Sequence, residues 1–580
     1  MIIKNYSFKK KYFNLLISYF LKTIFIKKFK IISLFLTLLI LILILIRNNS
    51  LFPSVMGDEF IHILNSKSSE FNNIKIYSPL YYFLYKSTFI CEDQFINCAR
   101  YLNLLFFLSA TFIFFLLCKK FSNKQISYYI FLILLLSPFN IYSAYFMPEM
   151  SYFFFVSLLF YNLLSLDLSK KNIFVLGVLC GLCSLVKPHA IFLLPGLIAY
   201  FFFLQKANLL NISILSIGFL ILKIFLYIFF SIKFSFFGEY YSSDGFNYLN
   251  ISLDQYIKII KYMIINLFGI INFLLIVFAI PLILTFNNIY VYFKIKNTTF
   301  KLAFFTFITI FSLIFIFSFF VSISANFHEH IHLHESPFRL NNRYYYFVLP
   351  LLLVVLAHNL FDFKKIVFNQ NVTTCLSVIF SISIIIYSFN TYENFHLVDA
   401  PLYRGIIHNN FFYVFIILFV LIMIIFFNYK KLATIKIYTF LFLPILFIIS
   451  SIPINKEILF YKNPSKSNLI GMELDNYFRN EDKKKYLIIN FNEKYSEKLD
   501  EFKILTSFNK QYVGIISFEN QNLDNINLSN NLIKVLSKKN PYWSYSNNID
   551  YDYIIIVLNK IKFEIYYFDT KIEILKKINS

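Results

Sequence analysis

Two adjacent carboxylates, Asp58 and Glu59, lie just past the first long apolar run of the chain. Ionisable groups close to membrane depth are costly and usually mark functional sites. A carboxylate at this place can accept the proton of an attacking hydroxyl group or hold a cation. We therefore predict that Asp58 and Glu59 form the chemical centre. The alternative is an acidic pair that caps an interfacial helix.

Four further charged residues lie near the ends of apolar runs. Glu149 follows Pro148 and either binds substrate, helps a metal or caps a helix start. Lys187 terminates an apolar segment as a lone cation, which indicates an anionic partner or a snorkelling lysine. Arg339 and Arg343 carry planar forks that suit phosphate, although one of them would also serve as an interfacial anchor.

A histidine-rich loop offers possible metal ligands, namely His328, His330, His332, His334 and Glu335. Histidines at every second position share one face of a strand, whereas on a helix only pairs spaced by four residues align. Imidazole and carboxylate suit zinc or manganese. A solvated or acceptor-binding loop is the favoured alternative. The sequence thus establishes no cofactor, but leaves Mg, Mn or Zn as candidates.

The composition indicates an α-helical polytopic membrane protein. The 580 residues are 58% hydrophobic and only 15% charged, and the apolar runs are continuous rather than alternating. The net charge of +23 comes from lysines between the apolar runs. We interpret these lysines as topology signals and contacts to membrane lipids, and not as a nucleic-acid site.

The apolar runs predict about 13 membrane-spanning helices of roughly 20 residues. The first, from residue 31 to 46, lacks a small-residue cleavage site and is expected to remain as an uncleaved span. The others are expected at 101–118, 126–145, 150–166, 172–186, 189–205, 209–231, 259–286, 302–324, 344–358, 373–389, 410–428 and 437–453. Lysine clusters fall in alternate loops, which places the N-terminus inside and the C-terminus outside.

Three regions follow from this count. Residues 1–30 form a basic cytoplasmic or interfacial N-terminus, and residues 31–453 form the transmembrane domain, whose first external loop covers 48–100. Residues 454–580 are polar with short apolar runs at 486–490, 512–517, 553–558 and 562–568, which predict strands beside helices at 467–479 and 529–538. We expect a small α/β domain on the extracytoplasmic side.

The cysteines give no clear framework. Cys91 and Cys98 lie in the first external loop and either pair or remain free thiols. Cys180 and Cys183 have CxxC spacing inside an apolar helix, with no second pair, so a metal or redox site is weakly indicated.

Five stretches in a fixed order give the chain its resemblance to a known family. They are Gly57-Asp58-Glu59, Ser78-Pro79-Leu80-Tyr81-Tyr82, Met147-Pro148-Glu149, the segment from Gly177 to Lys187, and Arg343-Tyr344. In this order the chain resembles the GT-C glycosyltransferases, in the branch of the aminoarabinose and protein-mannose transferases. The likeness covers roughly residues 30–360. It departs at Ser143, Ala144 and Tyr145, where many relatives carry an arginine, and at Val186, where threonine is usual.

The resemblance implies an inverting membrane glycosyltransferase with a polyprenyl-phosphate-linked sugar donor. It implies Asp58 as base, assisted by Glu59, on the outer face of the bacterial cytoplasmic membrane. It adds Tyr81, Tyr82 and Tyr344 to the binding candidates Glu149, Lys187, Arg339 and Arg343. The acceptor is a lipid, a glycan or a protein. A transporter or flippase of lipid-linked glycans is the alternative function, and a polysaccharide polymerase or ligase of another fold is a third.

Overall fold

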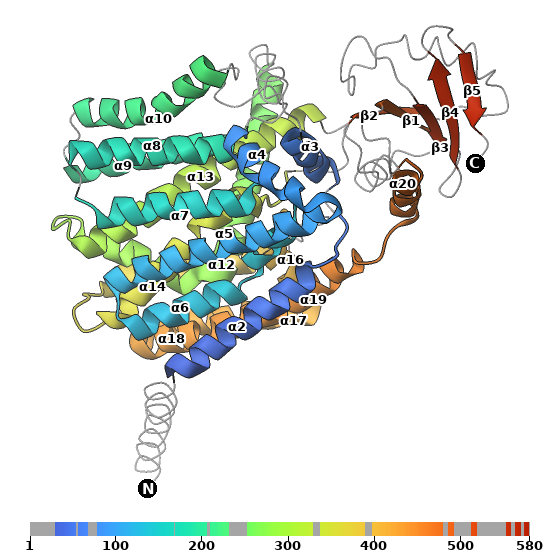
Figure 1. Cartoon of the computed structure of the whole chain (residues 1–580). Helices are drawn as coiled ribbons and strands as arrows, with labels where there is room; N and C mark the ends of the chain where they lie inside the picture. The colour runs from blue at the N-terminus through green and yellow to red at the C-terminus, as the bar shows by residue number, and fades with distance from the viewer. Residues whose placement is uncertain are drawn as a thin grey trace.

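The computed structural model describes residues 29–53, 56–67, 78–167, 169–205, 209–230, 252–328, 337–388 and 397–478, and five strands beyond them. Helices make up most of this part of the chain (Figure 1). The first half contains α2 (Phe29–Asn48), α3 (Met56–Lys67), α4 (Pro79–Lys86), η2 (Ser87–Gln94), α5 (Phe95–Phe121), α6 (Lys124–Leu136), η3 (Pro138–Ala144), α7 (Glu149–Ser165), α8 (Lys170–Val186), η4 (Pro188–Phe192), α9 (Leu193–Gln205) and α10 (Leu209–Phe230).

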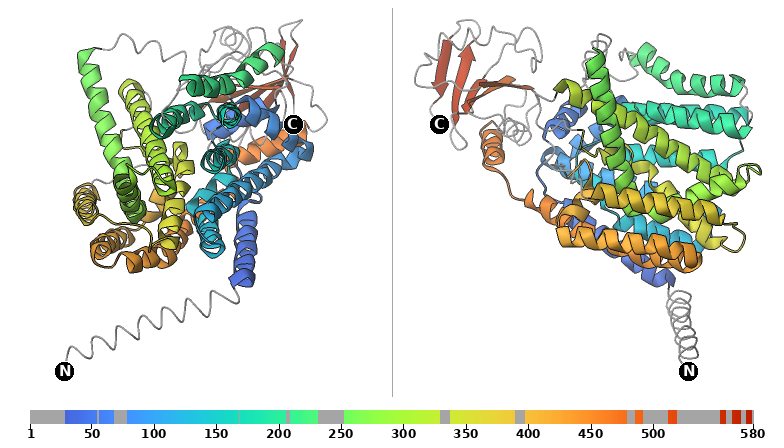
Figure 2. Two further views of the ribbon diagram at one scale, coloured as in Figure 1. Left: turned by 90° about the vertical axis from the view of Figure 1, so that its left-hand side faces the viewer. Right: turned by 180° about the vertical axis from the view of Figure 1, so that it is seen from behind.

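The second half of the helical part is built from longer helices. It contains α12 (Leu253–Tyr292), α13 (Thr298–His328), η6 (Asn342–Tyr344), η7 (Tyr346–Val348), α14 (Pro350–Phe361), α15 (Gln370–Ser388), α16 (Pro401–Ile407), α17 (Asn410–Tyr429), α18 (Lys431–Ile437), η8 (Tyr438–Phe442), α19 (Leu443–Phe460) and α20 (Lys466–Tyr477). Figure 2 shows many of these helices lying side by side, with α2 at one margin of the bundle.

Seven helices of the described part are long and apolar enough to cross a membrane, which identifies an integral membrane protein. The bent pair of α6 and η3 would bring this number to 8. The 13 spans expected from the sequence are therefore not confirmed. Several expected spans are shorter apolar helices, at Ile32–Asn48, Glu149–Ser165, Pro188–Leu204 and Tyr346–Phe361.

Proline residues account for the two main departures from straight spans. Pro138 follows α6 and begins η3, and the two helices are bent by 54°. Pro281 lies inside α12, and Phe278 one turn before it has non-helical dihedral angles. The sequence prediction of single spans at 126–145 and 259–286 did not include these breaks.

The lysine-rich helix ends gather at one end of the bundle. Three lysines there donate to groups at the ends of other helices: Lys120 to Ser165 O at 2.8 Å, Lys296 to Phe203 O at 2.7 Å and Lys431 to Gln370 Oε1 at 2.7 Å. These contacts connect ends that the lysine pattern assigns to the same side of the membrane.

Gly177 shows why part of the glycine-containing motif is structural. A Cβ atom on Gly177 would lie 2.3 Å from the backbone oxygen of Leu215 on α10, and one on Gly218 would lie 2.5 Å from Phe174 O. Helices α8 and α10 therefore approach each other closely through paired glycines, a common form of membrane helix packing.

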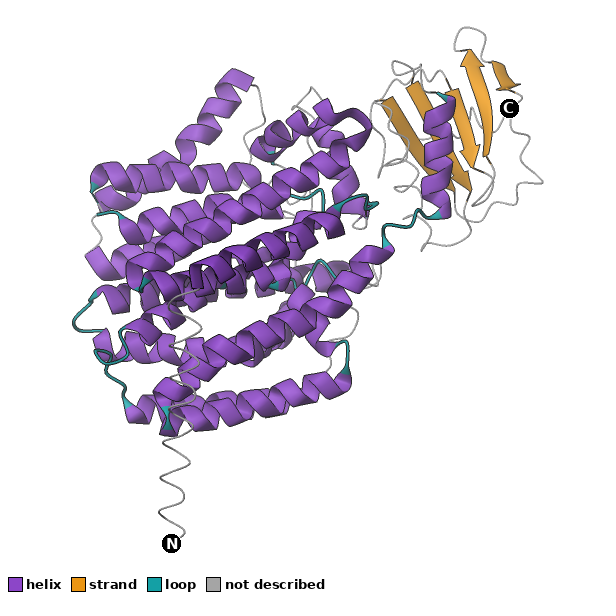
Figure 3. Ribbon diagram, turned by 60° about the horizontal axis from the view of Figure 1, so that its bottom comes forward, coloured by secondary structure: helices purple, strands orange, loops and turns teal. Residues whose placement is uncertain are grey.

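Five strands follow the helices and form one sheet (Figure 3). They are β1 (Lys485–Phe491), β2 (Tyr512–Phe518), β3 (Tyr553–Val557), β4 (Phe563–Asp569) and β5 (Ile574–Ile578), in the order β2-β1-β3-β4-β5. Strand β1 is parallel to β2 and β3, and the remaining pairs are antiparallel. Four strands coincide with the predicted apolar runs. The helix expected at 529–538 lies outside the described residues.

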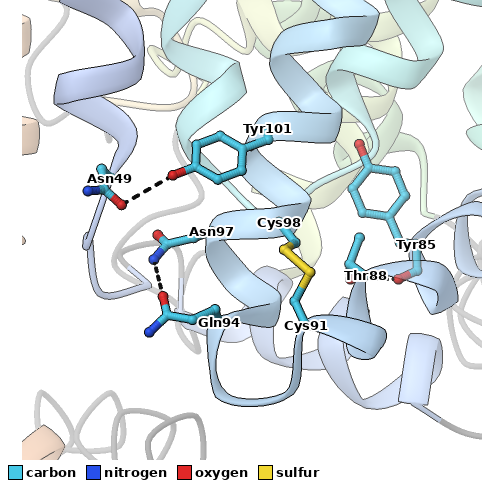
Figure 4. The surroundings of a disulfide bond; sticks show 8 residues. All are labelled: Asn49, Tyr85, Thr88, Cys91, Gln94, Asn97, Cys98 and Tyr101. Atoms are coloured by element: carbon cyan, nitrogen blue, oxygen red, sulfur yellow. Dashed lines mark hydrogen bonds between the residues drawn. A yellow bond between two sulfur atoms is a disulfide. The ribbon is translucent and has the colours of Figure 1, made fainter.

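Cys91 and Cys98 form a disulfide that joins η2 to the first turn of α5 (Figure 4). This settles the alternative that the sequence left open. Nearby, Asn97 donates to Gln94 at 2.7 Å and Tyr101 donates to Asn49 at 3.4 Å. The loop between α2 and α5 is thus fixed at its C-terminal end, after the α3 and α4 helices that it carries.

Candidate active site

Asp58 and Glu59 lie in the first turn of α3, and their side chains serve different partners. The Asp58 side chain is 38% exposed, and its Oδ2 accepts from Arg343 Nη1 at 2.7 Å. Glu59 is buried, and its Oε1 accepts the backbone N–H of Phe146 at 2.7 Å. Asp58 is therefore placed to meet a ligand, whereas Glu59 ties α3 to the segment that precedes α7.

Arg100 on α5 also bonds to the segment that precedes α7. Its buried guanidinium donates to Ala144 O at 2.8 Å and to Leu51 O at 2.6 Å. Its charge is also attracted to the carboxylate of Glu59. The start of the loop after α2 and the end of η3 are thus fixed around one buried cation, which stabilises the position of α3.

Arg339 and Arg343, which lie between α13 and α14, both contact the carboxylate of Asp399. The sequence did not single out this residue. Arg339 Nε donates to Asp399 Oδ2 at 2.8 Å, and Arg343 Nε lies 3.5 Å from Oδ1. The Asp399 side chain is only 1% exposed. Arg343 bridges Asp399 and Asp58, and its Nη2 donates to the hydroxyl of Tyr344 at 3.0 Å.

Lys187 is not the isolated cation that the sequence suggested. Its Nζ donates to Glu149 Oε1 at 2.9 Å, and the two side chains are 6% and 2% exposed. Lys187 caps the C-terminal end of α8, and Glu149 lies in the first turn of α7, so each charge is also favoured by its helix dipole. The Lys187 Nζ lies 4.8 Å from the centre of the Tyr344 ring, which places the pair beside Arg343.

The tyrosine candidates separate into two groups. Tyr344 lies beside Arg343 and Lys187, and its ring stacks on Phe317 at 4.8 Å between ring centres. Tyr81 and Tyr82 are fully buried residues of α4, and the hydroxyl of Tyr82 is bonded to two residues of α3, His62 at 3.2 Å and Asn65 at 3.1 Å. The face of α4 that carries Tyr82 is therefore buried against α3.

The charges of the cluster act on one another. Burial would raise the pKa of Asp58, but the charge of Arg343 and its hydrogen bond outweigh burial and lower that pKa below its usual value. Burial lowers the pKa of His62 to about 4, so this histidine is neutral at pH 7. Burial also lowers the pKa of Lys187, and the attraction of Glu149 opposes this. Asp58 is thus an ionised carboxylate at pH 7.

No group of three or more potential metal ligands occurs among the described residues. The predicted ligands His330, His332, His334 and Glu335 lie outside those residues, and α13 ends at His328. The proposal of a divalent cation therefore stays a prediction.

The structure brings Asp58, Glu149, Lys187, Arg339, Arg343 and Tyr344 together. It leaves Glu59, Tyr81 and Tyr82 as buried neighbours. The sequence did not single out three other residues of this region, which are Asp399, His62 and Arg100. The one available signal for Asp399 was its place as an acid in a loop assigned to the same side as Asp58.

Comparisons with known proteins give weak similarities. No family model matches the sequence, and no curated protein matches it. Among solved structures, the apo form of ArnT from Cupriavidus metallidurans is similar at 11% identity, with a TM-score of 0.47 over 84% of this chain and 85% of that chain. The same protein bound to undecaprenyl phosphate gives a TM-score of 0.46 at 11% identity, over 84% and 86% of the two chains.

An oligosaccharyltransferase from Archaeoglobus fulgidus, tethered to an acceptor peptide, is similar at 12% identity with a TM-score of 0.42. That match covers 87% of this chain and 64% of the archaeal protein. Because every one of these TM-scores is below 0.5, the similarities alone define neither the fold nor the activity of this chain.

Proposed function

We propose that the protein is a GT-C-type membrane glycosyltransferase that moves a sugar from a polyprenyl-phosphate donor to a lipid, glycan or protein acceptor. The observation that carries this proposal is the cluster in which Arg343 contacts Asp58, the candidate base, at 2.7 Å. Five segments far apart in the sequence supply its charged groups, and all of them lie at helix ends or in loops. This arrangement suits chemistry at one membrane surface.

The charges fit an inverting transfer. The oxygen of the acceptor hydroxyl bonds to the anomeric carbon, while the bond from that carbon to the phosphate oxygen breaks on the opposite face. The proton of the hydroxyl passes to the carboxylate of Asp58, and the lipid phosphate leaves with the electron pair. Arg343, Arg339 and Lys187 are suited to stabilise the negative charge of that phosphate. Glu149 is suited to accept from sugar hydroxyl groups.

We place the charged cluster on the outer side of the membrane because of the lysine distribution and the disulfide. The lysine-rich helix ends are assigned to the cytoplasm, which puts the cluster on the outer side. Disulfides persist in oxidising compartments, and the bond between Cys91 and Cys98 lies in the loop that also carries Asp58. On this topology the sheet of residues 485–578 belongs to an external C-terminal α/β domain, and the basic residues 1–30 lie inside.

The decisive experiment measures release of free polyprenyl phosphate by the purified full-length protein supplied with candidate polyprenyl-phosphate sugars. Asp58→Asn keeps the shape but removes the proton acceptor, so turnover should fall about 100-fold or more while donor binding persists. Asp362→Asn is the matched control. Asp362 is a partly exposed carboxylate paired with Lys365 at the lysine-rich end, where no chemistry is expected.

Three results would count against the proposal. Near-normal transfer by correctly inserted Asp58→Asn protein would remove this residue from the mechanism. Loss of activity in Asp362→Asn as well would indicate a general structural effect. Movement of lipid-linked glycan across liposomes without any release of lipid phosphate would favour the flippase.

A further inference from the structure

The charged cluster contains two arginines whose mutual repulsion must be balanced. Arg343 lies close enough to Arg339 for its charge to disfavour the charge of Arg339. Asp399 contacts both through their Nε atoms, at 2.8 Å for Arg339 and 3.5 Å for Arg343. Contact through Nε directs the outer nitrogens of Arg343 away from Asp399, towards Asp58 and Tyr344.

We propose that Asp399 is a positioning residue that holds Arg339 and Arg343 together as one phosphate-binding pair beside Asp58. This inference rests on the proposed function and deepens it. Asp399 itself touches no reacting atom, because it is buried behind the arginines. It acts by fixing the direction in which their guanidinium groups face.

The backbone around Asp399 is fixed, as a positioning role requires. The carbonyl oxygen of Asp399 accepts the backbone N–H of Arg343 at 3.1 Å. The neighbouring Val398 carbonyl accepts from the hydroxyl of buried Tyr142 on η3 at 2.9 Å. The backbone of Val398 and Asp399 is thus bonded both to Arg343 and to η3.

The segment that carries Arg339 is also held by α12. Asn266 on α12 is fully buried, and its Nδ2 donates to Pro337 O at 2.9 Å and to Arg339 O at 3.0 Å. With the backbone of the loop fixed, the remaining freedom lies in the long arginine side chains. A buried carboxylate that accepts from Arg339 and forms an ion pair with Arg343 is what orders them.

The test compares binding of undecaprenyl phosphate with binding of undecaprenol, which lacks the phosphate, to the full-length protein in detergent. Asp399→Asn keeps the size of the side chain and removes the charge. We expect it to weaken binding of undecaprenyl phosphate about 10- to 100-fold, the usual effect of losing charge-assisted contacts. Binding of undecaprenol should not change. A merely structural defect would weaken both ligands alike.

Two further variants sharpen the result. Asp399→Glu retains the charge and should recover part of the phosphate preference. In an Arg339→Gln background, Asp399→Asn should add less than it costs alone, because only the contact with Arg343 remains to be lost. Glu457→Gln is the control, since it removes a carboxylate from another arginine pair, with Arg404 at 3.2 Å. Its phosphate preference should equal that of the wild type.

The outcomes separate the two levels of the proposal. Unchanged or tighter binding of undecaprenyl phosphate by Asp399→Asn would show that Asp399 merely competes for the arginines, and would overturn its positioning role alone. Equal affinity of the wild type for the two lipids would overturn the proposed function together with this inference.

Discussion

The buried pair of Lys187 and Glu149 yields the sharpest stability prediction. Its atoms lie 2.9 Å apart, and both side chains are almost wholly removed from solvent. Breaking such a pair by removing one partner leaves an uncompensated buried charge, which typically costs about 3–5 kcal/mol. Replacing both partners with neutral groups of similar size should cost much less. We therefore compare Lys187→Met, Glu149→Gln and the double variant.

The stability of Glu149→Gln should depend on pH. In Glu149→Gln the buried ammonium of Lys187 is left alone, so its folded-state pKa falls further below the ordinary value. The penalty is full below that folded pKa and fades as pH rises through it. In Lys187→Met the buried carboxylate is left alone.

The assay is denaturant titration of the purified protein in mixed micelles between about pH 5 and pH 9, where the trend in Glu149→Gln is measurable. The double variant should show a small penalty that does not depend on pH. Single variants within about 0.5 kcal/mol of the wild type would place the pair in solvent and refute the reasoning. A double variant as unstable as the sum of the singles would show that the two residues do not interact.

Three other predictions follow from the same structure. Arg343→Gln should move the acidic limb of the pH–rate profile to higher pH, because the cation that lowers the pKa of Asp58 is lost. An unmoved limb would show that Arg343 does not set the pKa of the base. Gly177→Ala should cost about 1–3 kcal/mol, measured by thermal unfolding, because its new methyl group meets a backbone oxygen at 2.3 Å, whereas Gly196→Ala meets its nearest atom at 3.3 Å and should cost less. A reporter that is active only in the cytoplasm should be silent when fused to the C-terminus, and an active one would reverse the proposed topology.

Local pattern was sufficient for the parts of the site that lie at helix ends. The predicted span at 172–186 ends where α8 ends, so Lys187 was placed correctly at its C-terminal cap. Glu149 was likewise expected just after a proline at a helix start, and α7 begins there. Such positions are set by neighbouring residues, and therefore they can be read from the sequence.

The partners of these residues could not be read in the same way. Asp399 meets Arg339 across 60 positions, and Arg343 meets Asp58 across 285. No periodicity encodes such contacts, because they depend on how whole helices pack. The pairing of Lys187 with Glu149 was missed for this reason, although each residue had been selected alone.

The charges of the cluster suggest how a donor would activate the base. Ion pairs join three carboxylates, Asp58, Glu149 and Asp399, to three cations, Lys187, Arg339 and Arg343, so the cluster is neutral. An anionic phosphate adds excess negative charge and is best accommodated by taking a cation from the most exposed carboxylate, which is Asp58. Once Arg343 turns to the phosphate, the pKa of Asp58 rises, and a carboxylate of higher pKa is the stronger base. On this reasoning the donor would free the base that its own transfer requires, and the better buried Glu149 and Asp399 would keep their cations throughout.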